Sequence, residues 1–416
     1  MRAAAHNRAL LLLSLLAATT PVWANESGLP GATAASVLAL GRQLSPELRA
    51  MALERDAAAA RADAAGQLDD PTFRAISDEV DRTSGPRINK TYMSFEQEFP
   101  LWGKLDLKRS AALAALDAAR GREQAAGTEL DEKIKVAFAR YYAACRALKV
   151  NRDVASVAVA MAKLAKERYG QNLGSQNEAI TADAEVTRTG METARLESER
   201  RSAQARLNAL LARPPTASLA EPVELRRLPP DEPALAILMD RARAANPRLF
   251  TGAAEIRNAA SERELASKAW YPNVTLGAGA IQRDNGPPGY TASLAFKIPL
   301  QWGVKEAGER EAAAKLAATQ QRQAQLEADI GGDLEQTLAA LTAARRIGDL
   351  TRKQLIPKLE AAHKSAIALY RQNQGSLTEV LEAEHRLHQA RLDVLRADTD
   401  AQTALAAIER LIGAEL

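Results

Sequence analysis

Side chains that could carry out chemistry are few and scattered in this 416-residue chain. His385 and His388 lie one helical turn apart beside Glu384, and they could supply two ligands to a metal ion, but two ligands do not complete a site. The pattern is more typical of a solvated helix surface. Cys145 lies within a predicted helix, where a packed thiol is more common than a nucleophile. Residues 331–332, a Gly pair, lack the lysine and the preceding strand of a phosphate-binding loop. We therefore predict no enzyme activity, no cofactor and no metal site.

Three other charged residues are close together in the sequence. Glu379 and Glu382 are i, i+3 neighbours on a predicted helix, and Arg371 lies shortly before them. Acids spaced in this way are common on solvent-exposed helices. Their interpretation depends on the elements that position them.

The composition favours long helices over a globular enzyme. The chain is 46% hydrophobic but only 4% aromatic, and its apolar content is mostly Ala and Leu, as in helices packed side by side. Lys and Arg number 55 against 52 Asp and Glu, so the formal charge is only +3. This balance provides no basic footprint for nucleic acid.

Residues 1–24 have the organisation of a cleaved secretory signal peptide. Arg2 and Arg8 precede an apolar run over 9–18, and small residues follow it. The run is shorter than the about 20 residues of a membrane-spanning helix, and no cysteine follows that could accept a lipid. We expect an exported, non-lipidated chain that begins near Asn25.

The sequence repeats itself at an offset of 201 residues. Ser45-Pro46 returns as Asn246-Pro247, and the pattern Tyr-x-Gln-Asn-x-Gly-Ser begins at both Tyr169 and Tyr370. A Pro-Leu segment with a following Trp-Gly also recurs after each predicted strand pair. Landmarks at a common offset indicate two copies of one structural unit. We predict a first repeat over 25–212, a linker over 213–233 and a second repeat over 234–416.

Each repeat is predicted to contain a helix, a strand pair and a long helical hairpin. The expected elements of the first repeat are a helix over 33–69, strands over 72–80 and 91–99 (the pair 72–99), and helices over 104–169 and 176–212 (the hairpin 104–212). Those of the second are an opening helix, strands over 273–281 and 290–298 (the pair 273–298), and a hairpin over 305–413. Apolar residues recur every seven positions from Val380 to Ile408, which favours coiled-coil packing.

The strands alternate between apolar and polar residues. Tyr290, Leu294 and Phe296 share one face of their strand, whereas the intervening positions are small or polar. Such alternation in strands of about 9 to 11 residues matches tilted transmembrane β-strands. The alternative is an edge hairpin of a small soluble sheet, but no other predicted element would cover its apolar face.

Element lengths limit the architecture. A helix over 104–169 would be roughly 100 Å long, and those over 33–69 and 176–212 about 55 Å each, so two short helices end to end match one long helix. Each repeat thus becomes a strand hairpin with a helical column on one side. Because the smallest membrane barrels have about 8 strands, the four strands of one chain cannot close a barrel. We expect several chains to share it.

Together these features resemble the TolC-like outer-membrane efflux ducts. The similarity covers nearly all of the predicted mature chain and includes the hairpin ends at 169–175 and 370–376. It implies a mainly α fold with transmembrane β-strands, in which a homotrimer shares a 12-stranded β-barrel on a long α-helical barrel. The barrel would contact outer-membrane lipid, with the helical tunnel in the periplasm. The segment 97–104 is more similar to ducts of heavy-metal exporters of the CzcC and CusC type.

The resemblance also implies partners and a function. A periplasmic adaptor, or membrane fusion protein, and an inner-membrane resistance-nodulation-division pump are expected. The predicted function is the outer-membrane exit duct of a tripartite efflux system that conducts substrates passively, with heavy-metal cations as one candidate cargo. The alternative is a periplasmic coiled-coil adaptor or scaffold. Its strands would form compact modules, unlike the single strand pair between long helices in each repeat.

In this context the hairpin ends become the candidate site for adaptor docking. We predict that Gly174 and Gly375 adopt left-handed turn conformations after the long helices. Ser175 and Ser376 are predicted to cap the helices that follow.

The acids after the second turn become a candidate periplasmic gate. In a trimer, Glu379 and Glu382 would form a ring of carboxylates, and Arg371 is the expected local latch because a guanidinium can bridge carboxylates. Pro357 has no counterpart at Ser156 and predicts a kink about which the second hairpin could swing.

Overall fold

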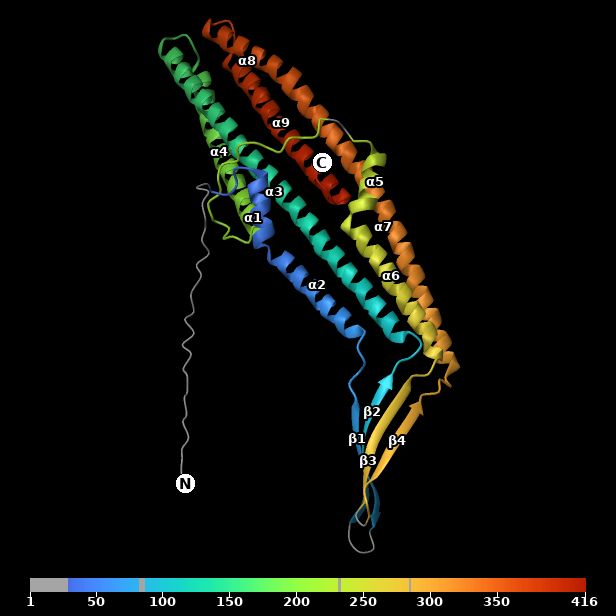
Figure 1. The fold of residues 1–416 in the computed structure, drawn as a ribbon. Helices are drawn as coiled ribbons and strands as arrows, with labels where there is room; N and C mark the ends of the chain where they lie inside the picture. Colours follow the sequence, from blue (N-terminus) through green and yellow to red (C-terminus); the bar gives the residue numbers. More distant parts are fainter. Residues whose placement is uncertain (1–28, 82–86, 231–232, 284–285) are drawn as a thin grey trace, which may run out of the picture.

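The computed structural model describes residues 29–81, 87–230, 233–283 and 286–416. The predicted signal peptide over 1–24 lies outside these residues. Figure 1 shows an elongated molecule, with the four strands at one end and two helical hairpin ends at the other. In this described part of the chain, no helix is both long and apolar enough to cross a membrane.

The first repeat contains two short helices, a strand pair and a long hairpin. Its elements are α1 (Ala34–Leu44), α2 (Pro46–Ala65), β1 (Thr72–Asp81), β2 (Arg87–Phe99), α3 (Lys104–Gly170) and α4 (Gln176–Leu210). The single helix predicted over 33–69 is wrong, because it breaks at Ser45. The Ser45 side chain accepts a hydrogen bond from the Leu48 amide at 3.3 Å, and Pro46, which has no N–H to donate, occupies the first turn of α2.

The second repeat follows the same order. Its elements are α5 (Leu235–Ala245), α6 (Pro247–Ser267), a 3₁₀ turn η1 (Lys268–Trp270), β3 (Val274–Arg283), β4 (Gly289–Phe296), α7 (Trp302–Leu350), a π-helical turn η2 (Thr351–Leu355), α8 (Ile356–Arg371) and α9 (Leu377–Ile412). Asn246 caps α6 as Ser45 caps α2, by accepting hydrogen bonds from the Arg248 and Leu249 amides. The duplication predicted from the sequence is therefore visible element by element.

Pro357, where the sequence predicts a kink, lies in the first turn of α8, directly after the π-helical turn η2. Proline removes a backbone donor, and its ring displaces the carbonyl one turn earlier, so the regular α-helical ladder cannot continue through it. At Ser156, the corresponding position of the first repeat, α3 continues without a break. The two hairpins therefore differ in the long helix that leads to their ends.

The four strands form one antiparallel sheet in the order β1-β2-β3-β4. The register places Phe73 beside Phe95, Phe95 beside Ala278 and Ala278 beside Ala292, so one apolar face crosses all four strands. The opposite face is more mixed: Ile76, Tyr92 and Ile281 lie side by side on it among polar and small residues. On this face Arg74 and Glu96 form an ion pair at 3.0 Å. The apolar face predicted from alternation is confirmed. No helix covers it in Figure 1, and the sheet extends away from the helical body.

Each repeat has its own apolar core in the helical body. Ile134, Phe138 and Leu207 are buried in the first core, and Leu334 and Ile408 in the second. The helix α3 runs along both repeats because it packs against α4 and also against α6 and α9. The seven-residue series on α9 is confirmed as a packing stripe: Val380, Leu387, Ala401 and Ile408 are buried and Val394 is half-buried.

A buried ion-pair network joins the two repeats near the C-terminal end of α9. Lys135 on α3 and Glu409 on α9 are each only 5% exposed, and their Nζ and Oε2 atoms are 2.8 Å apart. Arg226, from the connection between the repeats, reaches the same carboxylate at 3.0 Å. Loss of one member would leave a buried charge without its partner, so this network ties the linker and both repeats into one unit.

Candidate functional site

The two hairpin ends share one turn geometry. In the first, Asn172 has a φ of 56° and the Leu173 amide donates to the Arg168 carbonyl at 2.9 Å. In the second, Asn373 has a φ of 62° and the Gln374 amide makes the corresponding hydrogen bond to the Leu369 carbonyl, also at 2.9 Å. These bonds satisfy carbonyls at the helix ends that have no partner within the helix.

The prediction that Gly174 and Gly375 occupy the left-handed positions is wrong. The residues with positive φ are Asn172 and Asn373, whose short polar side chains tolerate this conformation. The glycines instead lie in narrow spaces, where an added Cβ atom would make its neighbours shift by a few tenths of an ångström. A Cβ atom on Gly375 would lie 3.1 Å from Cβ of Leu369, and one on Gly174 would lie 3.1 Å from a carboxylate oxygen of Glu178.

The predicted helix caps at Ser175 and Ser376 are confirmed, but they differ in one respect. Each serine hydroxyl accepts a hydrogen bond from the amide three residues later, at 3.2 Å for Ser175 and 3.3 Å for Ser376. At Ser376 the Glu379 carboxylate also accepts from the serine amide at 3.2 Å, which completes a capping box. Glu178, the counterpart of Glu379, faces Tyr370 of the other hairpin instead.

An arginine clamp joins the two hairpin ends. Arg168, at the end of α3, donates hydrogen bonds to the carbonyls of Tyr370 at 2.8 Å and Leu173 at 3.0 Å. Its guanidinium also lies 4.5 Å from the centre of the Tyr370 ring, within the range of a cation–π contact. Tyr370 is fully buried, in a cluster with Met161 and Ala165 of α3 and residues of α9. Burial, together with the Glu178 carboxylate, raises the pKa of the Tyr370 hydroxyl.

The sequence did not point to this clamp. Tyr169 and Tyr370 appear there as equivalent landmarks of the repeat. The only available signal was that Leu369 replaces Arg168 in the second copy, so the two ends could not make identical contacts.

The predicted local latch at Arg371 does not form within the chain. Glu382 pairs with Arg386 at 3.3 Å, one turn further along α9, and Glu379 is engaged in its capping box. Among the described residues, no ion pair joins Arg371 to either acid. All three side chains lie on the surface at the same hairpin end. Their role as a gate therefore remains a prediction about the assembled protein.

The histidines lie between the hairpins and not on a fully solvated surface, which corrects the expectation for His385 and His388. His385 contacts Arg188 of α4 and lies 3.4 Å from the Glu185 carboxylate. Burial lowers the pKa of His388, while the charge of Glu192 opposes that shift. Within the described residues, no group of three or more metal-ligating side chains is arranged to hold a metal ion.

Cys145 is buried in the first-repeat core, as expected for a packed thiol. Burial raises its pKa, and a hydrogen bond with Tyr141 only partly opposes this effect. A raised pKa keeps the sulfur in its weakly nucleophilic thiol form.

Comparison with known proteins gives the site its context. Residues 238–414, most of the second repeat, match the family described as outer membrane efflux protein. Protein CyaE of Bordetella pertussis is 29% identical over 195 residues, and this match spans 44% of the chain and 40% of CyaE. The solved structure of the outer-membrane channel OprN has a TM-score of 0.81 and an identity of 16%, with 94% of this chain and 93% of OprN covered.

The second repeat thus matches the outer membrane efflux protein family, and the chain as a whole has the fold of the outer-membrane channel OprN. The predicted fold class, mainly α with a small β part and an internal duplication, is confirmed. The solved structure of CusC has a TM-score of 0.80 at 14% identity, with 94% of this chain and 96% of CusC covered. That structure describes the formation of a transmembrane channel by CusC. OprN and CusC are thus equally similar in fold, so the fold does not distinguish between these two channels as the nearer relative of the chain. The proteins matched in structure are channels and not enzymes.

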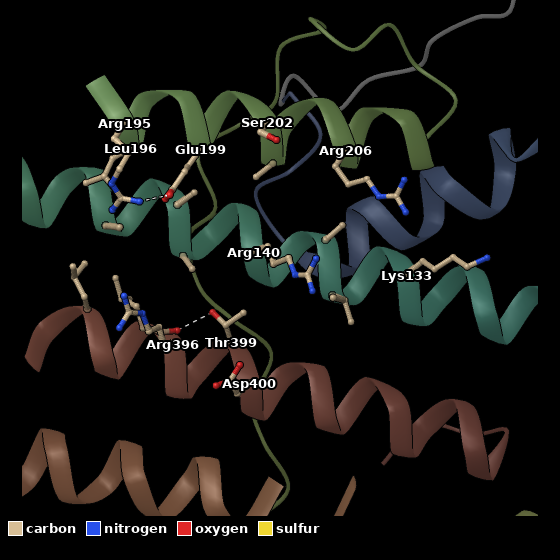
Figure 2. A pocket seen from close by; sticks show the side chains of 18 of the residues that line it. Lys133, Arg140, Arg195, Leu196, Glu199, Ser202, Arg206, Arg396, Thr399 and Asp400 are labelled. Atoms are coloured by element: carbon tan, nitrogen blue, oxygen red, sulfur yellow. Dashed lines mark hydrogen bonds and ion pairs between the residues drawn. The ribbon is translucent and has the colours of Figure 1, made fainter. Parts of the chain in front are cut away.

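A groove runs between the two repeats of the chain, along α3, α4 and α9. Figure 2 shows Arg195 and Arg206 on α4, Arg140 on α3 and Arg396 on α9 around it, with Asp400 at one side. The cavity has a volume of about 810 Å³, and Val136, Ala137 and Leu196 supply part of its apolar lining. Arginines outnumber acids around this groove, in contrast to the acidic residues that follow the second hairpin turn.

Proposed function

We propose that this protein is the outer-membrane exit duct of a tripartite efflux system, through which substrates pass passively. The observation that carries the proposal is the sheet, which has one uncovered apolar face and lies at the far end of hairpins roughly 100 Å long. An apolar face on strands of this length is suited to a lipid environment. The helices would then project into the periplasm.

The proposed assembly is a homotrimer that shares a 12-stranded β-barrel on an α-helical tunnel. Four strands with two open edges are too few for a closed membrane barrel, which needs about 8 or more. A periplasmic adaptor and an inner-membrane resistance-nodulation-division pump are the proposed partners at the hairpin ends. Heavy-metal cations are the proposed cargo class, on the basis of the segment 97–104 and the carboxylates of Glu379 and Glu382.

Membrane fractionation tests the duct proposal. We expect the protein in outer-membrane fractions, released only by detergent, and trimeric by mass photometry or native mass spectrometry. Recovery as a soluble periplasmic monomer would contradict the proposal and favour a coiled-coil adaptor or scaffold.

We propose further that the acids after the second turn act as the periplasmic gate, with Arg371 pairing with Glu379 or Glu382 of a neighbouring subunit. Glutamine can replace Glu379 in a capping box, so Glu379→Gln removes charge while it preserves the start of α9. In planar bilayers we expect Arg371→Ser to raise single-channel conductance. Glu379→Gln combined with Glu382→Gln should weaken cation preference. Parental conductance and selectivity in both variants would place the gate elsewhere.

A docking test uses Gly375. A valine there would press against Leu369 and displace the turn. We expect Gly375→Val to lower resistance to exported heavy-metal cations without lowering trimer yield. Gly190→Val on α4 is the matched control, because a Cβ atom at Gly190 meets nothing within 4 Å. Unchanged export by Gly375→Val would argue against adaptor docking at this end.

A further inference from the structure

The junction between sheet and helices contains a specific contact between the two repeats. Trp102, between β2 and α3, donates its indole N–H to the Pro272 carbonyl at 3.1 Å. Lys104 donates to the Tyr271 carbonyl and to Oδ1 of Asn273, both at 2.6 Å. The start of the first long helix is thus fixed to the segment that precedes β3.

The duplication repeats both halves of this contact, but the second pair does not meet within one chain. Trp302 and Lys305 correspond to Trp102 and Lys104, and residues 70–72 (Asp-Pro-Thr) correspond to residues 271–273 (Tyr-Pro-Asn). Trp302 is 66% exposed. In the described chain its indole N–H has no hydrogen-bond partner, and Lys305 forms no ion pair. Residues 70–72 are exposed and lie at the start of β1, at the other edge of the sheet.

The outer strands β4 and β1 carry the counterparts of residues that pair between β2 and β3. Inside the chain, Phe99 of β2 pairs with Val274 of β3. The counterparts of these residues are Ile298, just beyond β4, and Phe73 of β1. Ile298 is 67% exposed and Phe73 is 55% exposed, so each has an apolar side chain available for the other. The internal β2–β3 register therefore supplies a template for pairing β4 with β1 of a second copy.

We propose that Trp302 and Lys305 of one chain bind the segment 70–72 of a second copy of this chain. Trp302 donates to the carbonyl of Pro71 of the partner subunit, and β4 pairs antiparallel with the partner's β1 in a register that places Ile298 opposite Phe73. The proposal rests on the proposed function and deepens it, because it assigns residues and a register to the contact between subunits.

One difference between the two junctions adds an ion pair to the proposed contact. Tyr271, whose ring lies 5.1 Å from that of Trp102, is replaced by Asp70 at the other edge. The Asp70 carboxylate of the partner subunit can pair with Lys305. Burial is the main cause that lowers the pKa of Lys104, and the nearby positive charge of Lys305 lowers it further. A carboxylate beside Lys305 would therefore reduce the repulsion between Lys104 and Lys305 of one chain.

Disulfide crosslinking tests the register. In a Cys145→Ala background, we expect Phe73→Cys with Ile298→Cys to give covalent dimers and trimers on non-reducing gels. Phe73→Cys with Phe296→Cys is the off-register control, because diagonal neighbours are about 7–8 Å apart, beyond the reach of a disulfide. Phe99→Cys with Val274→Cys should crosslink only within one chain.

Native mass spectrometry before oxidation separates the two proposals. If the parent is not a trimer, the proposed function fails. If the parent is a trimer but the off-register pair crosslinks, or the Phe73 and Ile298 pair does not, then only the proposed register is overturned.

A second pair of variants tests the side chains. Trp302→Phe keeps an aromatic ring but removes the indole N–H donor. Lys305→Met keeps an unbranched apolar side chain but removes the positive charge. The double variant should dissociate to monomer at a concentration at least about 5-fold higher than the parent, the effect of losing about one hydrogen bond. Trp102→Phe is the matched control, because its contact lies within the chain. Equal dissociation of the control and the double variant would overturn the assignment of Trp302 and Lys305.

Discussion

Tyr169 at the first hairpin end is 48% exposed, whereas its counterpart Tyr370 at the second end is fully buried. The backbone turns that follow them are the same, with an asparagine in the left-handed conformation in each. The difference comes from the neighbouring hairpin. Arg168 of α3 holds Tyr370 through its carbonyl and ring, and Leu369, the counterpart of Arg168, cannot hold Tyr169 in the same way.

The acids that follow the two turns differ for the same reason. Glu379 folds back onto its own helix and completes a capping box, whereas Glu178 faces the buried hydroxyl of Tyr370. A duplicated sequence can therefore reproduce a turn and still give its two copies different roles. The first hairpin end supplies the groups that clamp, and the second supplies the ring that is clamped.

The largest effect is expected from removing the buried ring. Tyr370→Ala should lower the free energy of local opening at the hairpin ends by about 3–5 kcal/mol, the cost of a large cavity. Tyr169→Ala should cost less than about 1 kcal/mol because the ring is half exposed. Amide hydrogen exchange of residues 366–381 in detergent measures both. Equal acceleration by the two variants would contradict the asymmetry.

Loss of the clamp should have the next largest effect. Arg168→Leu reproduces the second copy at this position and removes two hydrogen bonds and a cation–π contact, so we expect a loss of about 2 kcal/mol in the same exchange experiment. Lys166→Leu is the control. It breaks the exposed pair with Asp183 at 2.8 Å and should cost less than about 1 kcal/mol. If Arg168→Leu behaves like this control, the clamp does not hold the ends together.

The two acids after the turns should give different readouts. Glu379→Ala removes half of a capping box and should lower the stability of the first turn of α9 by about 0.5–1 kcal/mol, measured by hydrogen exchange. Glu178→Ala should leave the start of α4 unchanged, because Ser175 provides the cap there. It should instead lower the raised pKa of Tyr370, followed by ultraviolet titration of the phenol. Destabilisation of α4 by Glu178→Ala would show that the two acids act alike.

The smallest expected effect is the pH dependence of stability around His388. The histidines of the described chain, His363, His385 and His388, all belong to the second hairpin. Burial lowers the folded pKa of His388, and the charges of His385, Arg188 and Arg391 add to the shift while Glu192 opposes it. The unfolded state then binds the proton more readily. The stability from neutral His388 is therefore present above about pH 6.5 and is lost as pH falls through the folded pKa.

Hydrogen exchange of α9 at pH 7.5 and pH 5 measures this dependence. His388→Gln should flatten it, and Thr187→Gln, at the corresponding position of α4, should not. A dependence that persists in His388→Gln would assign it to another group.

Local sequence by itself determined the repeated units, the helix caps and the apolar face of the sheet. Each depends on residues within a few positions of one another or on a simple period, so no long-range contact is needed to read it. Ser376 caps α9 because its hydroxyl reaches an amide three residues later, and the face shared by Leu294 and Phe296 follows from the two-residue period of a strand. The break at Pro357 is equally local, since proline lacks an N–H.

Only the tertiary structure decided which of two repeat-related residues makes a given contact. Arg168 and Tyr370 are 202 residues apart in sequence, and nothing near either residue indicates that they meet. The same holds for His385, because the sequence alone does not show that Glu185 of α4 lies beside it. It also holds for Arg371, which is close in sequence to Glu382, whereas Glu382 pairs with Arg386 in the structure. Burial, and with it the strength of each polar contact, depends on what packs from the other hairpin. That neighbour is set by the fold and not by the local sequence.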